Sequence, residues 1–470
     1  MGNFILVLLL AILILILLII KLNIHPVLAL FVSGMFAGIG FGYGVKNTVV
    51  TFTNGFGGTL GSIGCTIIFG SIIACGIRDS DSMKSMVNFF IKLFKGKALE
   101  LTTAMASFIM SIPVFGDITQ VLVAPIASLI AKRNEKSMST MATWACLGSA
   151  LTHSIVPPTP GILAVAILLG ADLGLTIFWG VIVSLIGFFV TWLLLKNWVD
   201  MEWIEPRSDY VMGIEPVKTS DYNDLMIKQE GLPNVLIASM PILVPVFLIA
   251  ASSFASIYLP EKNIFRIILE AIGDRNIALF IGVLITFVIG YKHRENVIAN
   301  YQMLTKKKEN NISKLMFNNW IKEALHVALL PLMITAMGGG FSAVIKSYPE
   351  ITTLGDLIAS VNFPGILVPF IIGAIMMISV GSRTTAGMTA AAIVAPMLSS
   401  LNLTPLAATL LCGAGTMIGS HVSDSGFWVA TQLFNLNTKQ GLKYITVIGS
   451  VCGLFVFIAI AAFNMLGFLG

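Results

Sequence analysis

Charged residues are scarce in this chain, and their scarcity excludes a water-soluble fold. Only 11% of the 470 residues are Asp, Glu, Lys or Arg, whereas soluble domains carry about 25%. Hydrophobic residues make up 56% of the sequence, and the mean hydropathy is +0.92. Such a chain cannot cover a surface that faces water, so we expect a lipid bilayer to surround it. No stretch resembles a hydrophilic domain of ~100 residues.

Other signals are missing as well. The five cysteines lie within apolar runs without a CxxC pair, so we expect no disulfide framework, no metal site and no other cofactor. No basic residue precedes the apolar run from Phe4 to Ile20, which argues against a signal peptide and for a first spanning helix. The net charge of +5 lies mainly in loops beside apolar segments, so it indicates membrane topology and not a nucleic-acid partner.

The apolar segments predict an all-α polytopic membrane protein, because a spanning helix needs roughly 20 apolar residues. We expect helices at 4–22, 26–45, 59–77, 139–172 (interrupted), 174–195, 234–259, 277–291, 325–345, 405–435 (interrupted) and 444–468. The connecting loop 196–232 would separate two transmembrane units, 1–195 and 233–470.

Two further stretches, 98–131 and 357–401, do not fit a single crossing. In the first, the apolar part carries one charge, Asp117, close to Pro113 and Gly116. A straight helix from Leu101 to Ala131 would measure about 46 Å, against a hydrocarbon core of about 30 Å. Because proline also breaks the helical hydrogen-bond ladder, we expect a re-entrant hairpin. One long kinked helix is the alternative.

Basic residues predict which ends of the segments face the cytoplasm. Both flanks of 98–131 are basic, so this hairpin would enter and leave on the cytoplasmic side. The basic loop 292–324 is also expected inside. The connecting loop 196–232 is then cytoplasmic, both termini lie outside, and 357–401 is a hairpin that enters from outside.

The two halves resemble each other in sequence. Val123–Ser128 recurs as Val394–Ser399, and His153 corresponds to His421, each preceded by a cysteine. The proline, cysteine and histidine pairs are offset by 271, 266 and 268 residues. Six membrane elements per half would place the second half upside-down. We therefore predict two inverted-topology repeats, each with a re-entrant hairpin and a broken transmembrane helix, the plan of many secondary transporters that work by alternating access.

Four breaks in the helices are predicted, one hairpin tip and one broken helix per half, at 113–117, 153–161, 381–387 and 419–426. The helix-breaking residues are Pro113, Gly116, Pro157, Pro158, Gly381 and Gly426. Irregular backbone at membrane depth is tolerated only where it is buried in protein or faces water. Free amide groups at half-helix starts attract anions, and free carbonyls suit cations or protons.

Arg383 is the only charge between Leu357 and Ser423. An arginine inside the membrane is costly unless it meets an anion or water, and its planar fork can hold a carboxylate through two hydrogen bonds. We interpret Arg383 as a clamp for a substrate carboxylate. The alternatives are an internal salt bridge to Asp117 or Asp424, and snorkelling towards the surface.

Two carboxylates and two histidines complete the candidate site. Asp117 and Asp424 lie at breaks in opposite halves and are candidates for ion coupling, since a carboxylate there can carry a proton; helix capping is the alternative. His153 and His421 could relay protons or bind a substrate hydroxyl, or simply pack. Asp172 is expected to be structural. Hydroxyl groups that suit a hydroxylated ligand come from Ser382, Thr384, Thr385, Ser420, Ser423 and Ser425.

At these motifs the chain resembles the gluconate permease family, proton symporters of the larger ion-transporter superfamily. The segments that carry the resemblance are Ile112–Asp117, His153–Pro160, Leu169–Gly174, Gly381–Ser382 and, most specifically, Gly419–Trp428. The resemblance spans nearly the whole length. It implies proton-coupled uptake of a small hydroxylated carboxylate, gluconate or a related sugar acid or hydroxy acid, across a bacterial inner membrane.

The resemblance leaves the substrate open. Some members carry D-serine or short hydroxy acids, so a permease for amino acids or short carboxylic acids is an alternative. Arg383 stands where the family usually has a small residue, and Thr159 replaces a histidine; the added charge favours a more acidic or dicarboxylic substrate. The expected coupling ion is H⁺, with Na⁺ as the alternative. The expected partners are a small organic anion, the lipid bilayer and a second copy in a homodimer.

Two alternatives belong to other classes of protein. Asp117 and Asp424 could form the dyad of an intramembrane aspartyl hydrolase, but such enzymes typically show Gly-x-Gly-Asp, and the segment here is Val114-Phe115-Gly116-Asp117. No His-Glu-x-x-His metal motif occurs either. A passive anion channel is the second alternative. We predict a transporter and not an enzyme.

Overall fold

All regular structure in the computed structural model is helical within the residues that it describes, which are 2–22, 24–95, 98–112, 116–211, 231–306, 308–347, 364–421 and 424–469. By length and composition five helices can cross a membrane, or six if the bent pair Gly44–Ser62 and Gly64–Asp79 forms one span. The all-helical fold predicted from the apolar segments is confirmed.

The first half contains α1 (Gly2–Ile20), α2 (Pro26–Gly40), α3 (Gly44–Asp79), α4 (Ser82–Leu93), α5 (Leu99–Met110), α6 (Gly116–Arg133), α7 (Met138–Ile155), α8 (Pro160–Leu169), α9 (Leu173–Val199) and α10 (Ser208–Val211). The second half contains α11 (Val235–Tyr258), α12 (Ile264–Ile272), α13 (Arg275–Lys292), α14 (Arg294–Thr305), α15 (Ile312–Lys314), η2 (Leu315–Trp320), α16 (Ile321–Lys346), α18 (Leu367–Val380), α19 (Arg383–Val394), η4 (Ala395–Met397), α20 (Pro405–Gly415), α21 (Ser425–Leu433), α22 (Thr438–Gly441), η5 (Leu442–Val447) and α23 (Ile448–Met465). The helices interrupted at 139–172 and 405–435 are present as α7–α8 and α20–α21.

Short polar side chains start several of these helices by accepting hydrogen bonds from free backbone amides. Asp274 caps α13 by accepting a bond from the amide of Asn276 at 3.0 Å. Asp172 caps α9 through the amide of Leu175 at 2.7 Å, and its second oxygen accepts a hydrogen bond from Ser253 at 3.1 Å. The structural role expected for Asp172 is confirmed.

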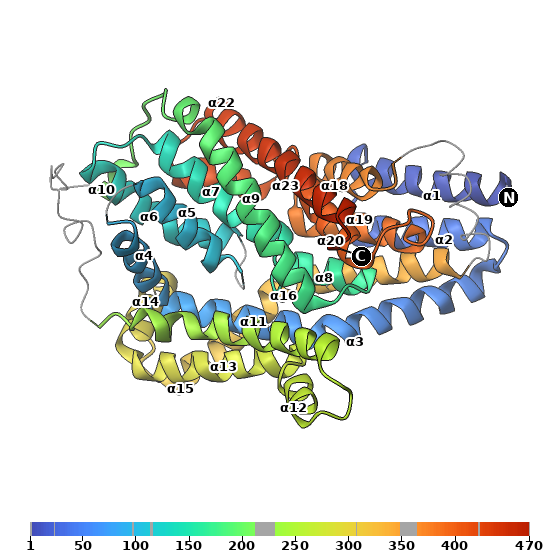
Figure 1. The fold of residues 1–470 in the computed structure, drawn as a ribbon, viewed down its shortest axis with the longest axis horizontal. Helices are drawn as coiled ribbons and strands as arrows, with labels where there is room; N and C mark the ends of the chain where they lie inside the picture. Colours follow the sequence, from blue (N-terminus) through green and yellow to red (C-terminus); the bar gives the residue numbers. More distant parts are fainter. Residues whose placement is uncertain are drawn as a thin grey trace.

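The helix predicted at 59–77 is too short, because α3 begins at Gly44. The early part of α3 is rich in glycine, threonine and asparagine, and its helical form comes from packing against α16. A Cβ atom added to Gly55 would lie 2.5 Å from the Ala343 Cβ and 2.7 Å from the Gly339 carbonyl oxygen. Glycines thus let the two backbones approach closely, as small residues do between membrane helices. Figure 1 shows α3 and α16 running along the long axis of the molecule.

The expected hairpins at 98–131 and 357–401 are each divided into two short helices. Helices α5, α18 and α19 have 12, 14 and 12 residues, which makes each about 18–21 Å long and too short for a core of about 30 Å. Helix α6, with 18 residues, is longer, at about 27 Å. Helices α5 and α6 both pack on α7, and α18 and α19 both pack on α20. Pro113, at the first tip, and residues 357–363 lie outside the described ranges.

Helices of these two regions also contact the other half of the chain. Helix α6 packs against α21, and α8 packs against α19. Likewise α3 packs on α16 and α9 packs on α23. Helices α4, α10 and α14 lie at one end of the long axis, opposite the chain's N-terminus (Figure 1). Helices from the two halves of the chain therefore pack directly against each other.

Glu202, just after α9 in the connecting loop, forms hydrogen bonds with residues of both halves. Its carboxylate accepts hydrogen bonds from Gln440 (2.8 Å), Tyr444 (2.7 Å) and Lys443 (3.0 Å), and its backbone carbonyl accepts one from the Ser137 hydroxyl at 2.7 Å. The hydrogen bonds from Gln440, Tyr444 and Lys443 lower the pKa of Glu202 from its ordinary 4.5 to about 2. The charged form of this carboxylate therefore stabilises the fold.

Replacing Glu202 by Gln is expected to lower the free energy of unfolding at pH 7 by about 1 kcal/mol, a figure reduced for the screening of a partly exposed group. Because folding lowers the pKa, the contribution is present above pH 4.5 and is lost as the pH falls towards 2. In thermal unfolding of the detergent-purified protein, the difference in melting temperature between wild type and variant should shrink as the pH is lowered. Glu205→Gln, at an exposed neighbouring carboxylate, is the control. A difference in melting temperature that does not change with pH would contradict the stabilising role of the charged Glu202 carboxylate.

Gly55→Ala is expected to destabilise the protein by about 1–3 kcal/mol, since the new methyl group would clash with α16. Gly57→Ala is the matched control two residues further along α3, where an added Cβ meets nothing within 4 Å. There the higher helix propensity of alanine should leave stability unchanged or improve it. Melting temperatures in detergent measure both. Equal effects of the two substitutions would show that the α3–α16 contact is not tight.

Candidate functional site

Gly116, the first residue of α6, lies beside His153 near the end of α7. A Cβ atom added to Gly116 would lie 4.0 Å from the Cβ and Cγ atoms of His153. Asp117 follows Gly116 in α6, and its side chain is outside the described part of the structure. The start of α6 therefore meets the end of α7.

His153 joins the second break to the third. Its Nε2 atom lies 3.1 Å from the hydroxyl of Thr384 at the start of α19. The start of α8 is close as well, because a Cβ atom added to Gly161 would lie 3.0 Å from the Thr384 Oγ1. The broken helix of the first half thus contacts the hairpin of the second half through polar side chains.

Arg383 joins the third break to the fourth. Its Nη1 atom is 3.4 Å from Asp424 Oδ2, and its Nη2 donates a hydrogen bond to Ser420 Oγ at 3.1 Å. Asp424 also accepts hydrogen bonds from the Ser420 hydroxyl and from the amide of Gly426, the latter at 2.9 Å. The side chains of Arg383 and Asp424 are only 12% and 5% exposed. Gly116, His153, Thr384, Arg383 and Asp424 thus lie along one chain of contacts inside the protein.

This geometry decides between the structural alternatives for Arg383 and Asp424. Arg383 forms an internal salt bridge with Asp424 and does not snorkel to the surface in this conformation. Asp424 is both the N-cap of α21 and the partner of Arg383. Ser382 caps α19 by accepting a bond from the amide of Thr385 at 3.4 Å.

Local hydrogen bonds hold the backbone at the second, third and fourth breaks. Gly381 and Gly419 adopt φ angles of +67° and +72°, in the left-handed region that favours glycine. At the end of α7 the Thr159 hydroxyl lies 3.2 Å from the carbonyl oxygen of Val156 and 3.4 Å from that of Thr152. The amide of Gly419 donates to Ser450 at 2.9 Å. Groups freed by the breaks are thus satisfied within the protein.

The electrostatic environment favours an anion. Arg383 is the first residue of α19 and Asp424 caps α21, so two helix N-termini and one guanidinium surround a single described carboxylate. Helix N-termini carry partial positive charge. The Arg383 Nε atom is buried and donates no hydrogen bond to any described residue. The arginine therefore keeps donor capacity after it has bound Asp424.

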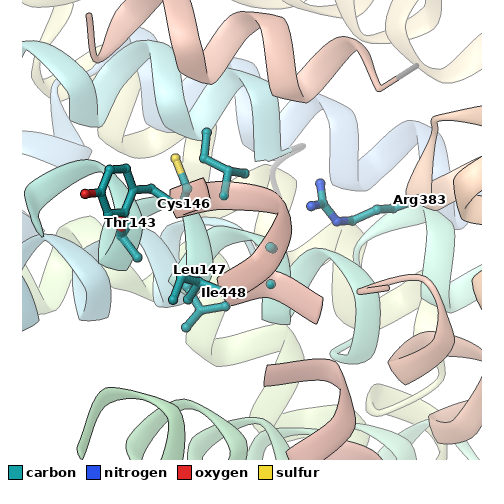
Figure 2. A pocket seen from close by; sticks show the side chains of 9 residues that line it. Thr143, Cys146, Leu147, Arg383 and Ile448 are labelled. Atoms are coloured by element: carbon teal, nitrogen blue, oxygen red, sulfur yellow. The ribbon is translucent and has the colours of Figure 1, made fainter. Parts of the chain in front are cut away.

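A small cavity lies against Arg383, and Figure 2 shows the guanidinium approaching it from the side opposite Thr143. The cavity is lined by Thr143, Cys146, Leu147, Ala150, Arg383, Tyr444, Ile445, Ile448 and Gly449. Its volume of about 10 Å³ is close to the room that one water molecule needs. A sugar acid does not fit, so this conformation is closed around the arginine.

Sequence reasoning missed two polar side chains of this cavity. Thr143 sits mid-helix in an apolar context, without a mark that separates it from packing residues. Tyr444 lies in the π-helical segment η5; such irregular turns frequently occur at functional sites, but they are not visible in a sequence. His421 lies half-buried next to the fourth break. The side chains of Ser423 and Ser425 are outside the described part.

Thr384→Val is expected to lower the free energy of unfolding by about 1 kcal/mol, because it removes the bond to His153 at almost constant volume. Thr389→Val is the matched control on α19, since the buried Thr389 hydroxyl has no hydrogen-bond partner among the described residues. That change should be neutral or stabilising. Thermal unfolding in detergent compares the two variants. An equal loss in both would indicate that the His153 contact contributes nothing.

The chain is similar to known permeases over nearly its whole length. The model of the family described as GntP family permease matches residues 3–466. A gluconate permease of Pseudomonas aeruginosa is 29% identical over 433 residues, covering 92% of this chain and 91% of the relative. The D-serine transporter DsdX of Escherichia coli K12 is 28% identical over 430 residues, covering 91% and 90%.

Solved structures share the fold. The YdaH transporter of Alcanivorax borkumensis matches with a TM-score of 0.58 and 15% identity, covering 91% of this chain and 90% of that one. MtrF of Neisseria gonorrhoeae, from a class of antimetabolite efflux pumps, gives the same score and identity over 89% and 83%. At this level of identity the likeness concerns the architecture alone.

Proposed function

Because the chain belongs to the GntP permease family, we propose that it is a secondary active transporter that takes up a small hydroxylated carboxylate together with protons. The family and its relatives are permeases and transporters, so the chain is a multi-pass membrane transporter and not an enzyme. The aspartyl hydrolase alternative is thereby excluded.

The observation that carries the substrate class is the placement of Arg383. It is buried, lies at the start of a half-helix, contacts Asp424 and keeps an unused donor. A carboxylate can bind such a guanidinium through paired hydrogen bonds. The neighbouring hydroxyls of Ser420 and Thr384, with His153, suit the hydroxyl groups of a sugar acid or hydroxy acid. Thr385, His421, Ser382, Ser423 and Ser425 complete the proposed substrate site.

Gluconate or a related sugar acid is the proposed substrate, because one relative is a gluconate permease and another is a high-affinity gluconate transporter. The second candidate is D-serine or another small amino or carboxylic acid, which the similarity to DsdX favours. Asp117 and Asp424 are the proposed ion-coupling residues, with H⁺ as the coupling ion and Na⁺ as its alternative.

Alternating access by two inverted repeats is the proposed mechanism. Its support is the reciprocal packing of α6 on α21 and of α8 on α19, together with hairpin arms too short to span the core. We place the repeats at 1–195 and 233–470, the loop 196–232 in the cytoplasm and both termini outside, in a bacterial inner membrane. A homodimer remains a prediction. Reporter fusions at both termini test the orientation.

Transport of the purified protein in proteoliposomes tests the function. With an alkaline interior, labelled D-gluconate is expected to accumulate, and unlabelled D-gluconate on the far side should accelerate counterflow. A passive anion channel would equilibrate the label without counterflow. A thermal-shift screen of sugar acids, hydroxy acids and amino acids ranks gluconate against D-serine. If no sugar or hydroxy acid accumulates, the proposed substrate class is wrong.

Arg383→Gln is expected to weaken D-gluconate binding at least about tenfold, which corresponds to about 1.4 kcal/mol, and to leave the weaker binding of gluconamide almost unchanged. The reason is that only the carboxylate needs the guanidinium. Competition against labelled D-gluconate in detergent measures both ligands. A similar loss for acid and amide would indicate that Arg383 is structural.

A further inference from the structure

We propose that Arg383 exchanges partners during transport, releasing Asp424 to bind the substrate carboxylate while Asp424 takes up the coupling proton. This inference rests on the proposed function and adds the step that links substrate to proton. The two carboxylates would use the same guanidinium in turn. When no substrate is bound, the Asp424 carboxylate is the anion that pairs with Arg383.

The geometry favours exchange over simultaneous binding. The Nη1–Asp424 separation is 3.4 Å, longer than the 2.7–2.9 Å typical of strong charge-assisted hydrogen bonds. Asp424 has two other donors, Ser420 and the Gly426 amide, so it remains bonded when Arg383 leaves. The cavity beside Arg383 holds about 10 Å³, which leaves no room for a second carboxylate until the groups move.

The charges at this site also favour exchange over simultaneous binding of both carboxylates. If a substrate carboxylate joined an ionised Asp424 at one guanidinium, two negative charges would share one positive partner inside the membrane, at high cost. Protonation of Asp424 removes this repulsion. A protonated Asp424 can still accept a bond from the Gly426 amide through its unprotonated oxygen, so the cap of α21 persists.

Other titratable groups near Asp424 provide no substitute counter-charge for a bound anion. The elements around Asp424 carry these charged or titratable groups: Arg383 of α19, His153 and Cys146 of α7, Asp117, Lys132 and Arg133 of α6, Lys439 of α22, Lys443 and Tyr444 of η5, and His421 in the same break. Lys132 and Arg133 belong to the last turn of α6, fifteen or more residues after Asp117. Lys443 is engaged by Glu202. Arg383 is the cation in direct contact with Asp424, so one positive charge serves both carboxylates.

The charge balance follows directly. One proton binds to the Asp424 carboxylate and one monocarboxylate anion binds to Arg383, so loading adds no net charge to the site. In this exchange Asp424 alone takes up a proton and Asp117 adds none, so transport of a monocarboxylate should be electroneutral, with one proton for each anion. A pH difference would drive it, and a membrane potential alone would not.

Asp424→Asn tests the exchange, because asparagine caps a helix as well as aspartate does but cannot ionise. In the wild type, the apparent Kd for D-gluconate is expected to rise about tenfold per pH unit where Asp424 is ionised. In Asp424→Asn it should be independent of pH, counterflow should persist, and accumulation driven by pH should be lost. Asp172→Asn, the matched change at the N-cap of α9, should keep the wild-type pH dependence.

Three results would overturn the exchange. The first is an unchanged pH dependence of binding in Asp424→Asn, and the second is loss of D-gluconate binding at every pH in Asp424→Asn that elutes as a single species. The third is accumulation in liposomes with the wild-type protein, driven by a potassium-diffusion potential at equal pH. The last measurement needs no variant. Absence of D-gluconate binding and accumulation in the wild type itself would instead refute the proposed function, and the exchange with it.

Discussion

Lipid offers no hydrogen bonds, so every interrupted helix in this chain has to satisfy its freed backbone groups with protein atoms. Thr159, Ser450 and the caps at Ser382 and Asp424 do so at three of the four breaks. The same requirement concentrates hydroxyls and carboxylates where the breaks meet. A polar centre inside an apolar protein is therefore a direct consequence of the broken helices.

Arg383 and Asp424 show how one pair of residues serves architecture and chemistry together. The arginine lies where the dipole of α19 is positive and requires an anion nearby, while the aspartate caps α21 and supplies that anion. The Gly426 amide of α21 donates a hydrogen bond to Asp424, but the opposite charge comes from Arg383 of α19. Their contact joins the hairpin of the second half to its broken helix, and Thr384 extends the connection to His153 in the first half.

Much of this organisation could be predicted from the sequence. Segment length and the rarity of charge indicated the helices, and the helix-breaking prolines and glycines indicated the breaks at α7–α8, α18–α19 and α20–α21. The early start of α3 could not be predicted, because contact with Gly339 and Ala343 stabilises residues whose own propensities do not favour a helix. Arg383 and Asp424 were recognised singly, but their pairing depends on a tertiary approach that no local pattern records. Tyr444 was missed because a π-helical turn has no sequence signature.

The closed cavity has a consequence for the cell that carries this protein. Among the described residues, the space next to the arginine has room for about one water molecule. Protons cross membranes readily along continuous files of water, and a solitary molecule between packed helices is not such a file. In the proposed proton-coupled cycle, a carrier resting in this conformation would therefore not let protons leak through the space beside Arg383.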